Sequence, residues 1–270
     1  MKIPSILEML QAGVHFGHQV SRWHPKMKPF IFTERNRVHI INLEETEKQL
    51  AVVLAEVKNM TAAGKVILFA TTKPQSREIV RAAAIACGAP YLVDRWLGGM
   101  LTNFSEIKKL VKKYNSLKEK TAKGELGNYT KKEQLEISRE LQKMDGYLAG
   151  LMTLEKMPDA LFIPSVQREK TAVTEANKMD VPIIGVCDTN ANPTKVAYVI
   201  PANDDAVKSI DDGKSRGRSR ERRQSRTGAK TTKFIVFGAV AKWANVIPAK
   251  AGIQKIRLDC NVTGFPPSRE

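Results

Sequence analysis

Residues 65–70 read KVILFA, and this short stretch decides the fold. After the lysine it contains no polar side chain, whereas a strand with one face in water alternates apolar and polar residues. An uninterrupted apolar run of this length, followed by turn signals, predicts a strand that is buried on both faces. Such a strand requires helices on both sides of its sheet.

The segments around this run alternate between helical and strand patterns. Apolar residues recur at helical spacing over residues 45–63 and predict an amphipathic helix there: Leu50, Val53, Leu54, Val57 and Met60. Ser76 is predicted to cap a helix that runs to Cys87 and stops at Gly88. Further strands are predicted at residues 91–93, 161–163, 181–187 and 196–200, with helices over residues 168–178 and through Ala206 and Ile210. This alternation predicts a parallel sheet with helices on both faces, wound right-handed.

The residues before the first long helix predict a small substructure. Residues 5–12 predict a short helix, and Gly13 is its stop signal. Residues 30–32 and 38–41 are apolar and flank a polar turn, which predicts a hairpin.

Residues 104–150 interrupt the strand–helix alternation. Asn103 and Glu106 stand three apart and resemble a capping box at a helix start. Two apolar series with helical spacing follow, separated by a polar stretch with Gly124 and Gly127: first Ile107, Leu110, Tyr114 and Leu117, then Leu135, Leu141, Met144, Leu148 and Leu151. Their narrow seam predicts an antiparallel coiled-coil hairpin that leaves its lysines outside. We therefore predict an α/β body of residues 1–103 and 151–213, with residues 104–150 inserted as an arm.

The net charge of +16 is distributed unevenly along the 270 residues. Residues 214–270 carry a net +11 with almost nothing to bury, so they are predicted to form a disordered basic tail. Residues 1–213 carry only +5, with local excesses of +4 in residues 19–40 and in residues 104–150. A basic excess of this kind favours a polyanionic partner such as RNA.

Cations and planar side chains are the groups that bind phosphate and exposed bases, and they occur together in residues 22–28. Packing of Trp23 against the body is the alternative role for its ring. The predicted RNA contacts are Arg22, Trp23, His24, Lys26, Lys28, Arg35, Arg37, Arg95, Lys108, Lys109, Lys112 and Lys113.

Other polar groups are candidates for metal or catalytic sites. His15, His18 and His24 lie close in sequence, but no carboxylate or cysteine nearby completes a metal site, so no metal is predicted. Residues 98–103 (GGMLTN) match neither common phosphate-binding glycine motif, and the paired glycines favour a tight turn where the arm begins. Residues 188–190 and 203–205 follow strands and could bind Mg²⁺ or a ribose, but they are interpreted as turn and cap residues, the commoner role of Asp and Asn after strands. No catalytic arrangement is recognisable.

The cysteines and the hydropathy pattern narrow the class of protein further. Cys87, Cys187 and Cys260 are widely spaced and predict neither a zinc ribbon nor a disulfide framework. The first two stand in apolar surroundings typical of core thiols. No apolar run approaches the roughly 20 residues of a membrane span. These features favour a reduced, cytoplasmic setting.

Six motifs occur in an order that resembles one family: AGVHFGH (12–18), HPKMKPFIF (24–32), RVHIINLE (37–44), RWLGGMLTN (95–103), MPDALFI (157–163) and CDTNANP with YVIPANDDA (187–206). The chain is similar over about residues 5–209 to the bacterial small-subunit ribosomal protein two (S-two) family. The tail lies outside this resemblance.

The resemblance implies a flavodoxin-like parallel sheet with a projecting coiled-coil hairpin, and no catalytic residues or cofactor. It implies binding to small-subunit ribosomal RNA, neighbouring subunit proteins, and help in seating the messenger-RNA-binding protein S-one, with ribosome-associated localisation in the cytoplasm. Two alternatives stay open: a mononucleotide- or flavin-binding enzyme on the same fold, and a diverged, free RNA-binding protein.

Overall fold

A five-stranded parallel sheet forms the centre of the computed structural model, which describes residues 3–123 and 130–205. The strand order is β5-β4-β6-β7-β8, and every neighbouring pair is parallel. The strands are β4 (Ile67–Ala70), β5 (Tyr91–Leu92), β6 (Ala160–Ile163), β7 (Ile183–Cys187) and β8 (Tyr198–Pro201). The predicted parallel α/β sheet is thereby confirmed, with each strand within two residues of its expected limits.

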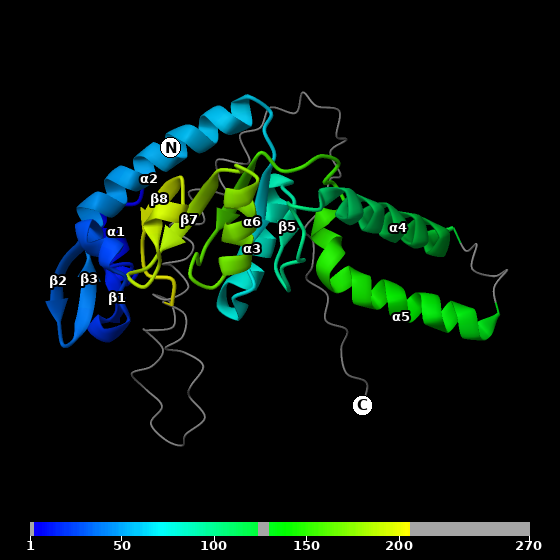
Figure 1. The fold of residues 1–270 in the computed structure, drawn as a ribbon, viewed down its shortest axis with the longest axis horizontal. Coiled ribbons are helices and arrows are strands. Elements are labelled where there is room, and N and C mark those ends of the chain that lie inside the picture. The colour runs from blue at the N-terminus through cyan, green and yellow to red at the C-terminus, as the bar shows by residue number, and fades with distance from the viewer. Residues whose placement is uncertain (1–2, 124–129, 206–270) are drawn as a thin grey trace, which may run out of the picture.

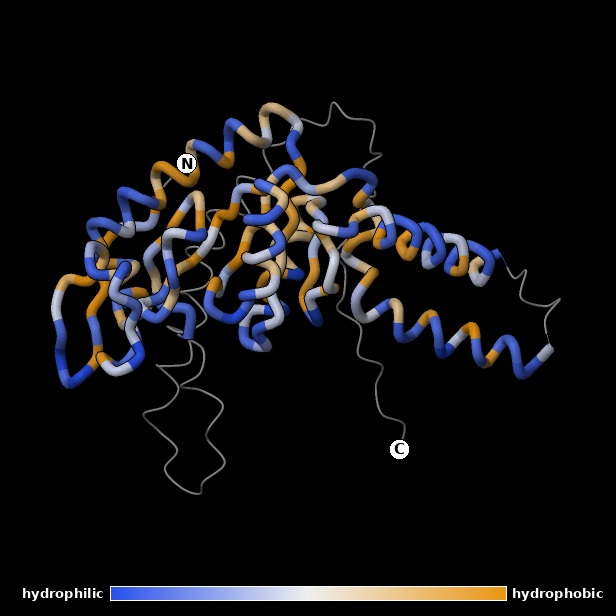
Figure 2. Tube along the Cα trace, viewed as in Figure 1, coloured by the Kyte–Doolittle hydropathy of each residue, from blue (hydrophilic) through white to orange (hydrophobic). Residues whose placement is uncertain are grey.

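The apolar run of β4 is buried on both faces, as its sequence predicts. Ile67 and Phe69 belong to one apolar cluster, whereas Leu68 and Ala70 belong to a second cluster on the opposite face. The first cluster includes residues of α2 (Leu43–Ala62) and α3 (Pro74–Cys87); the second includes residues of α6 (Lys170–Lys178) and of the arm. Apolar residues gather in the central sheet in Figure 2. Helices thus cover both faces of the sheet.

The start of α3 differs from the predicted one. The helix begins at Pro74, and Lys73 occupies the N-cap position without a side-chain cap bond. Proline favours the first helical position because its missing N–H would have no partner there, so it overrides the cap signal of Ser76. Ser76 lies inside the helix and is buried. The predicted stop is confirmed, since Gly88 ends the helix with a φ of 66°.

A small antiparallel sheet precedes the main one, in the order β1-β3-β2. Its strands are β1 (Phe16–Gln19), β2 (Ile31–Arg35) and β3 (Val38–Ile41), and it follows helix α1 (Ile6–Gln11). The predicted helix and hairpin are confirmed. No strand was predicted at residues 16–19, but they pair with the free edge of β3, because a strand formed by edge pairing carries little propensity signal of its own.

Two helices extend away from the sheet, α4 (Phe104–Ala122) and α5 (Lys131–Leu148), and we call them the arm (Figure 1). Asn103 precedes α4 but makes no side-chain cap bond, so the predicted capping box is wrong at this helix. A capping box starts α5 instead, between Thr130 and Glu133. The Asn103 side chain accepts a bond from the Ser105 hydroxyl and from no helix amide.

The arm helices contact each other mainly near the sheet. Val111, Tyr114, Met144 and Leu148 are buried there, and the Tyr114 hydroxyl donates a hydrogen bond to Asp145. Leu135, near the start of α5, is 51% exposed. Figure 2 shows hydrophilic residues along most of both helices. A coiled coil along the whole arm therefore stays a prediction.

Several predictions concern residues outside those described. They are the turn with Gly124 and Gly127, the short helix through Ala206 and Ile210, and the basic tail of residues 214–270. The division into a body, an arm and a tail as separate units also stays a prediction. Among the described residues, no helix has the length and apolar character needed to cross a membrane.

Both described cysteines are core thiols, as expected. Cys87 ends α3, Cys187 ends β7, and both are buried and unbonded to another cysteine. Burial raises the pKa of Cys87 and raises that of Cys187 to about 12, where the nearby carboxylates of Asp204 and Asp188 add to the effect. A thiol with so high a pKa stays protonated and chemically inert.

Candidate functional site

The tip of the β2–β3 hairpin presents two arginines. Asn36 and Arg37 have φ values of 50° and 60°, the backbone of a two-residue turn that matches the twist of its strands. Arg35 and Arg37 are both exposed, and neither forms an ion pair with a described side chain. Their guanidinium groups are therefore available for an external anion.

The segment between β1 and β2 is tied to the body by polar bonds. The backbone N–H of His24 donates to the Thr189 carbonyl at 2.8 Å, and His24 Nδ1 accepts from the Lys26 backbone N–H at 3.2 Å. The Lys26 ammonium donates to the Thr194 hydroxyl at 3.3 Å. His24 and Lys26, both predicted RNA contacts, thus hold the segment in place.

Trp23 also contacts the protein itself. Its ring lies 5.2 Å from that of His39, which is only 8% exposed on β3, and Trp23 is half-buried. This contact favours the packing role over base stacking. Arg22 and Lys28 are exposed, and within the described chain neither has an ion-pair partner. They are the cations that this segment leaves free for phosphate.

The predicted lysines of α4 are all exposed: Lys108, Lys109, Lys112 and Lys113. Two of them are used internally, since Lys109 pairs with Glu106 at 2.6 Å and Lys113 pairs with Glu140 of α5 at 2.7 Å. The other two stand four residues apart on one helix face, without an ion-pair partner among the described residues. Arg95 is exposed in the loop that leads to the arm.

These cations form two separate groups. Figure 1 shows the β1-β3-β2 sheet at one end of the molecule and the arm at the other. The sequence already separated basic excesses in residues 19–40 and residues 104–150, and the structure places them at opposite ends of the molecule. An RNA ligand that used both groups would have to span the molecule.

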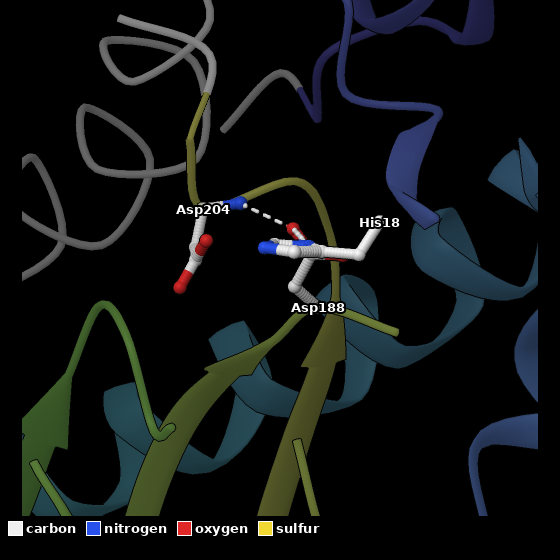
Figure 3. A group of neighbouring side chains, drawn as sticks. All are labelled: His18, Asp188 and Asp204. Carbon is white, nitrogen blue, oxygen red and sulfur yellow. Dashed lines mark hydrogen bonds and ion pairs between the residues drawn. The ribbon is translucent and has the colours of Figure 1, made fainter. Parts of the chain in front are cut away.

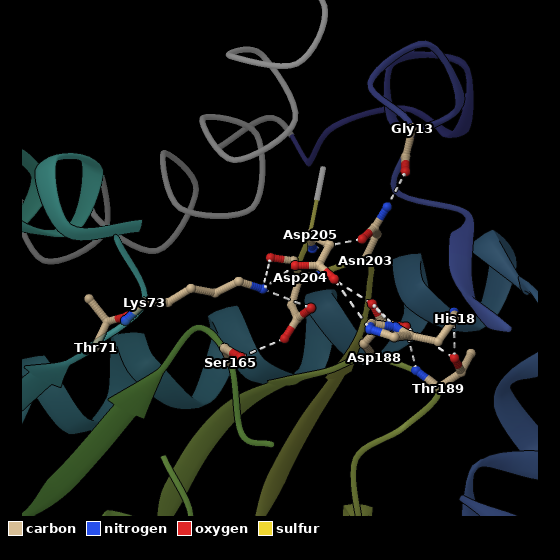
Figure 4. Close-up of polar contacts among 10 residues, drawn as sticks. All are labelled: Gly13, His18, Thr71, Lys73, Ser165, Asp188, Thr189, Asn203, Asp204 and Asp205. Carbon is tan, nitrogen blue, oxygen red and sulfur yellow. Dashed lines mark hydrogen bonds and ion pairs between the residues drawn. The ribbon is translucent and has the colours of Figure 1, made fainter. Parts of the chain in front are cut away.

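A buried ionic cluster lies at the carboxyl edge of the main sheet (Figure 4). Lys73 follows β4, Asp188 follows β7, and Asp204 and Asp205 follow β8. Lys73 Nζ lies 2.9 Å from a carboxylate oxygen of Asp204 and 2.9 Å from one of Asp205. Lys73, Asp188 and Asp204 are each less than a tenth exposed. The lysine therefore neutralises the buried carboxylate of Asp204 together with the partly exposed carboxylate of Asp205.

His18 brings the small sheet into this cluster. Its Nδ1 lies 3.1 Å from Asp188 and its Nε2 lies 3.2 Å from Asp205. Hydrogen bonds to these two carboxylates raise the pKa of His18 to about 10, against the effect of burial. The pKa of Asp205 is lowered in return, chiefly by His18 and then by Lys73. The imidazole is thus a cation that joins β1 to the ends of β7 and β8.

The cluster is also the place where a metal ion would fit. One ligand atom each of His18, Asp188 and Asp204 lie within 4.8 Å of one another (Figure 3). One nitrogen and two carboxylates are a donor set that Zn²⁺ accepts. The other two histidines are elsewhere, since His15 packs 4.0 Å from Phe16 and His24 caps a turn. That the protein binds no metal stays a prediction, which metal analysis of the purified protein checks.

The cluster was missed at the level of sequence. Residues 188–190 and 203–205 were interpreted chiefly as turn and cap residues, with Mg²⁺ or ribose binding as the alternative, and Asn203 does cap a turn by accepting the backbone N–H of Asp205 at 2.8 Å. A usable signal existed, because the carboxyl ends of parallel strands meet at one edge of a sheet. The proximity of the carboxylates after β7 and β8 was therefore predictable. No local pattern in the sequence indicated that His18 of β1 would contact them.

The same edge bears on the enzymatic alternative. Doubly wound sheets bind nucleotides in the crevice beyond the carboxyl ends of their strands. Here Lys73 and Asp204 occupy the ends of β4 and β8, and Ser165 after β6 donates a hydrogen bond to Asp204 at 2.5 Å. Side chains of the protein itself thus satisfy the polar groups that would otherwise serve a ligand.

Comparison with known proteins gives one consistent result. The family model described as "Ribosomal protein S2" matches residues 9–212. The small ribosomal subunit protein uS2 of Coprothermobacter proteolyticus is 43% identical over 210 residues, which are 78% of each chain. The protein of the same name from Parabacteroides distasonis is 44% identical over 204 residues, covering 76% of this chain and 73% of the relative.

Proposed function

The chain belongs to the ribosomal protein S2 family, and from that premise we propose that it binds small-subunit ribosomal RNA through two separate basic surfaces. Members of this family are structural components of the small ribosomal subunit. The protein is accordingly a structural constituent of the ribosome that serves translation, and it is not an enzyme. Association with the ribosome in the cytoplasm accompanies this function.

The observation that carries the proposal is the set of exposed cations without an internal partner among the described residues. The hairpin surface consists of Arg22, Lys28, Arg35 and Arg37, and the arm surface consists of Arg95, Lys108 and Lys112. Residues 19–40 and residues 104–150 each carry a net charge of +4, so most of these cations lie in the locally basic parts of the body. Their grouping at two ends supports phosphate binding at both places.

We expect the two surfaces to contribute separately to RNA affinity. Replacing Arg35 and Arg37 by alanine, or Lys108 and Lys112 by alanine, should flatten the log–log salt dependence of binding by roughly 0.7–0.9 for each phosphate that is no longer neutralised. The measurement is filter binding of the full chain to transcribed small-subunit ribosomal RNA at several salt concentrations. The control is Arg168→Ala with Lys170→Ala, an exposed basic pair away from both surfaces.

The outcome separates the surfaces. If one pair leaves the slope at the value of the control, that surface is not part of the interface. If both pairs do so, the proposed mode of RNA binding is wrong.

Assembly into the subunit is the broader test. We expect the tagged protein to sediment with small subunits at physiological salt, and to be released as salt is raised, because binding to phosphate weakens steeply with salt. The readout is its distribution across a sucrose gradient. A protein that stays in the unbound fraction at low and physiological salt contradicts the proposal.

A protein partner is the second part of the proposal. Residues 151–213 carry a net charge of −4, which disfavours phosphate and favours a neighbouring protein. We propose that the chain helps to seat the messenger-RNA-binding protein S-one, as expected from the family resemblance. Small subunits reconstituted without this chain should then retain less S-one in the same gradients.

A free RNA-binding protein is the alternative that one observation favours. Residues 213–270 lie outside the family match, and the tail of residues 214–270 carries a net +11. Such a tail is able to bind RNA without a ribosome. Complementation separates the two functions, because only a ribosomal protein restores growth when the resident copy is lost.

A further inference from the structure

We infer that Glu175 of α6 is a positioning residue that sets the direction of the arm, and thereby presents the arm surface to RNA. The inference rests on the proposed RNA binding by the arm. It concerns the loop that joins β5 to α4, which contains the RWLGGMLTN motif. The proposed RNA contacts do not explain the internal hydrogen bonds that hold this loop.

The Glu175 carboxylate is held by N–H donors of that loop. One oxygen accepts from Trp96 Nε1 and from the Gly99 backbone N–H, both at 3.0 Å, and the other accepts from the Leu101 backbone N–H at 3.1 Å. Successive backbone N–H groups that converge in this way form an anion-binding concavity. The anion bound here is a side chain of the protein itself.

The carboxylate must be charged to satisfy these donors. Burial acts to raise the pKa of Glu175, but the bonds from Trp96, Leu101 and Gly99 outweigh it and hold the pKa below its ordinary value. A carboxylate that accepts several N–H bonds is stabilised in its ionised form. An amide in its place would have one acceptor oxygen, and its NH₂ group would oppose the remaining donor.

The loop connects the residues that are hydrogen-bonded to Glu175 with the start of the arm through only a few residues. Leu101 is bonded to Glu175, and α4 begins three residues later at Phe104. Gly99 has a φ of 83°, which closes a turn, and its carbonyl accepts the Asn103 N–H at 2.8 Å. Met100 and Leu101 are buried in the core. Little freedom therefore remains between the carboxylate and the first turn of α4.

The chain offers a matched control in Glu169, which immediately precedes α6. Its carboxylate also accepts donors from a loop, namely the backbone N–H and the hydroxyl of Thr72. That loop follows β4 and leads to α3, not to the arm. Both Thr72 donors reach one oxygen of Glu169, so Glu169→Gln keeps an acceptor for them and removes only the charge. Glu175→Gln removes the same charge and also the acceptor of the Leu101 N–H at the root of the arm.

The experiment measures the position of the arm directly. Spin labels are placed at Ala55→Cys in α2 and Glu119→Cys in α4, both exposed, in a full-length background with Cys260→Ser. The remaining cysteines, Cys87 and Cys187, are buried and stay unlabelled. We expect Glu175→Gln to broaden or shift the distance distribution between the labels, and Glu169→Gln to leave it unchanged.

RNA binding is then measured on the same variants with transcribed small-subunit ribosomal RNA. We expect Glu175→Gln to weaken binding by roughly threefold to tenfold and to flatten its salt slope, because the misdirected arm neutralises fewer phosphates. The RNA affinity of Glu169→Gln should stay within about twofold of that of the parent protein, and the melting temperature should be similar. The reason is that both basic surfaces can still neutralise the same phosphates.

Each result has a definite meaning. An unchanged distance distribution in Glu175→Gln overturns the positioning role. A changed distribution with unchanged RNA affinity shows that Glu175 positions the arm but removes the arm from the RNA interface, so it is the proposed function of the arm that fails. An equal loss of affinity in both variants reduces Glu175 to a general contributor to stability.

Discussion

Replacing Lys73 by alanine should lower the free energy of unfolding by about 3–5 kcal/mol, the cost of leaving buried charge without its partner. Lys73 Nζ contacts Asp204 and Asp205 at 2.9 Å each, and its side chain is only 10% exposed. Without the ammonium, His18 is the one cation among the described residues that still pairs with the carboxylates of this cluster, at Asp188 and Asp205. Urea unfolding followed by circular dichroism gives the measurement.

The control for this substitution is Lys48→Ala. Lys48 pairs with Glu45 at a similar distance of 3.0 Å, but its side chain is 68% exposed. An ion pair that is exposed to water contributes little to stability, so only a small loss is expected. If the two alanine variants lose equal stability, water reaches the Lys73 cluster and it is not a buried ionic core.

A second partner tests whether the loss comes from the cluster. Asp204→Asn removes one carboxylate that Lys73 neutralises, so the double variant Lys73→Ala with Asp204→Asn should lose less stability than the two single losses added together. Such non-additivity is expected of residues in one ionic network. Strict additivity would mean that the two side chains act independently.

Replacing Gly150 by alanine is the second substitution for which we expect a large effect. A Cβ at this position would lie 2.2 Å from the Tyr91 carbonyl oxygen and 2.6 Å from Tyr91 Cδ2. Backbone atoms at that distance cannot be avoided by a rotamer change, so the end of the arm must move away from β5. We expect a loss of about 3 kcal/mol or more, the upper range for overpacking.

Gly146 is the matched control, four residues earlier in α5. No atom lies within 4 Å of a Cβ built there, so alanine fits without displacement. Because glycine in a helix interior is less favourable than alanine by about 0.5–1 kcal/mol, Gly146→Ala should stabilise the protein. Urea unfolding should show that the free energy of unfolding falls in Gly150→Ala and rises in Gly146→Ala. A change of the same sign in both variants would contradict the close contact of Gly150 with β5.

The fold was largely predictable because its signals are local. The apolar run of β4 indicates burial on both faces, and the helical spacing of apolar residues locates α2 whatever the neighbours do. The errors lie where a neighbour decides the structure. Strand β1 exists because β3 offers an edge, and Asn103 stands at the N-cap position of α4 while its side chain bonds to Ser105 and to no helix amide.

The candidate site was predictable only in part. The exposure of the basic side chains was predictable, because a charged side chain on a polar helix face or hairpin tip is exposed in almost any fold. Their contact with RNA stays a prediction. Whether a cation has a partner within the protein was not predictable. Lys113 forms an ion pair with Glu140 of the other arm helix, and the Lys26 ammonium donates a hydrogen bond to the Thr194 hydroxyl. The separation of the two basic surfaces also follows from the fold alone.

The sequence by itself determined the buried strand of residues 65–70, the parallel sheet around it and the family, since these depend on patterns read along the chain. Tertiary structure alone decided that His18 and Lys73 meet Asp188, Asp204 and Asp205, and that Glu175 holds the root of the arm. The reason is strand order. Residues far apart in sequence become neighbours only when parallel strands align their carboxyl ends and the loops return across them.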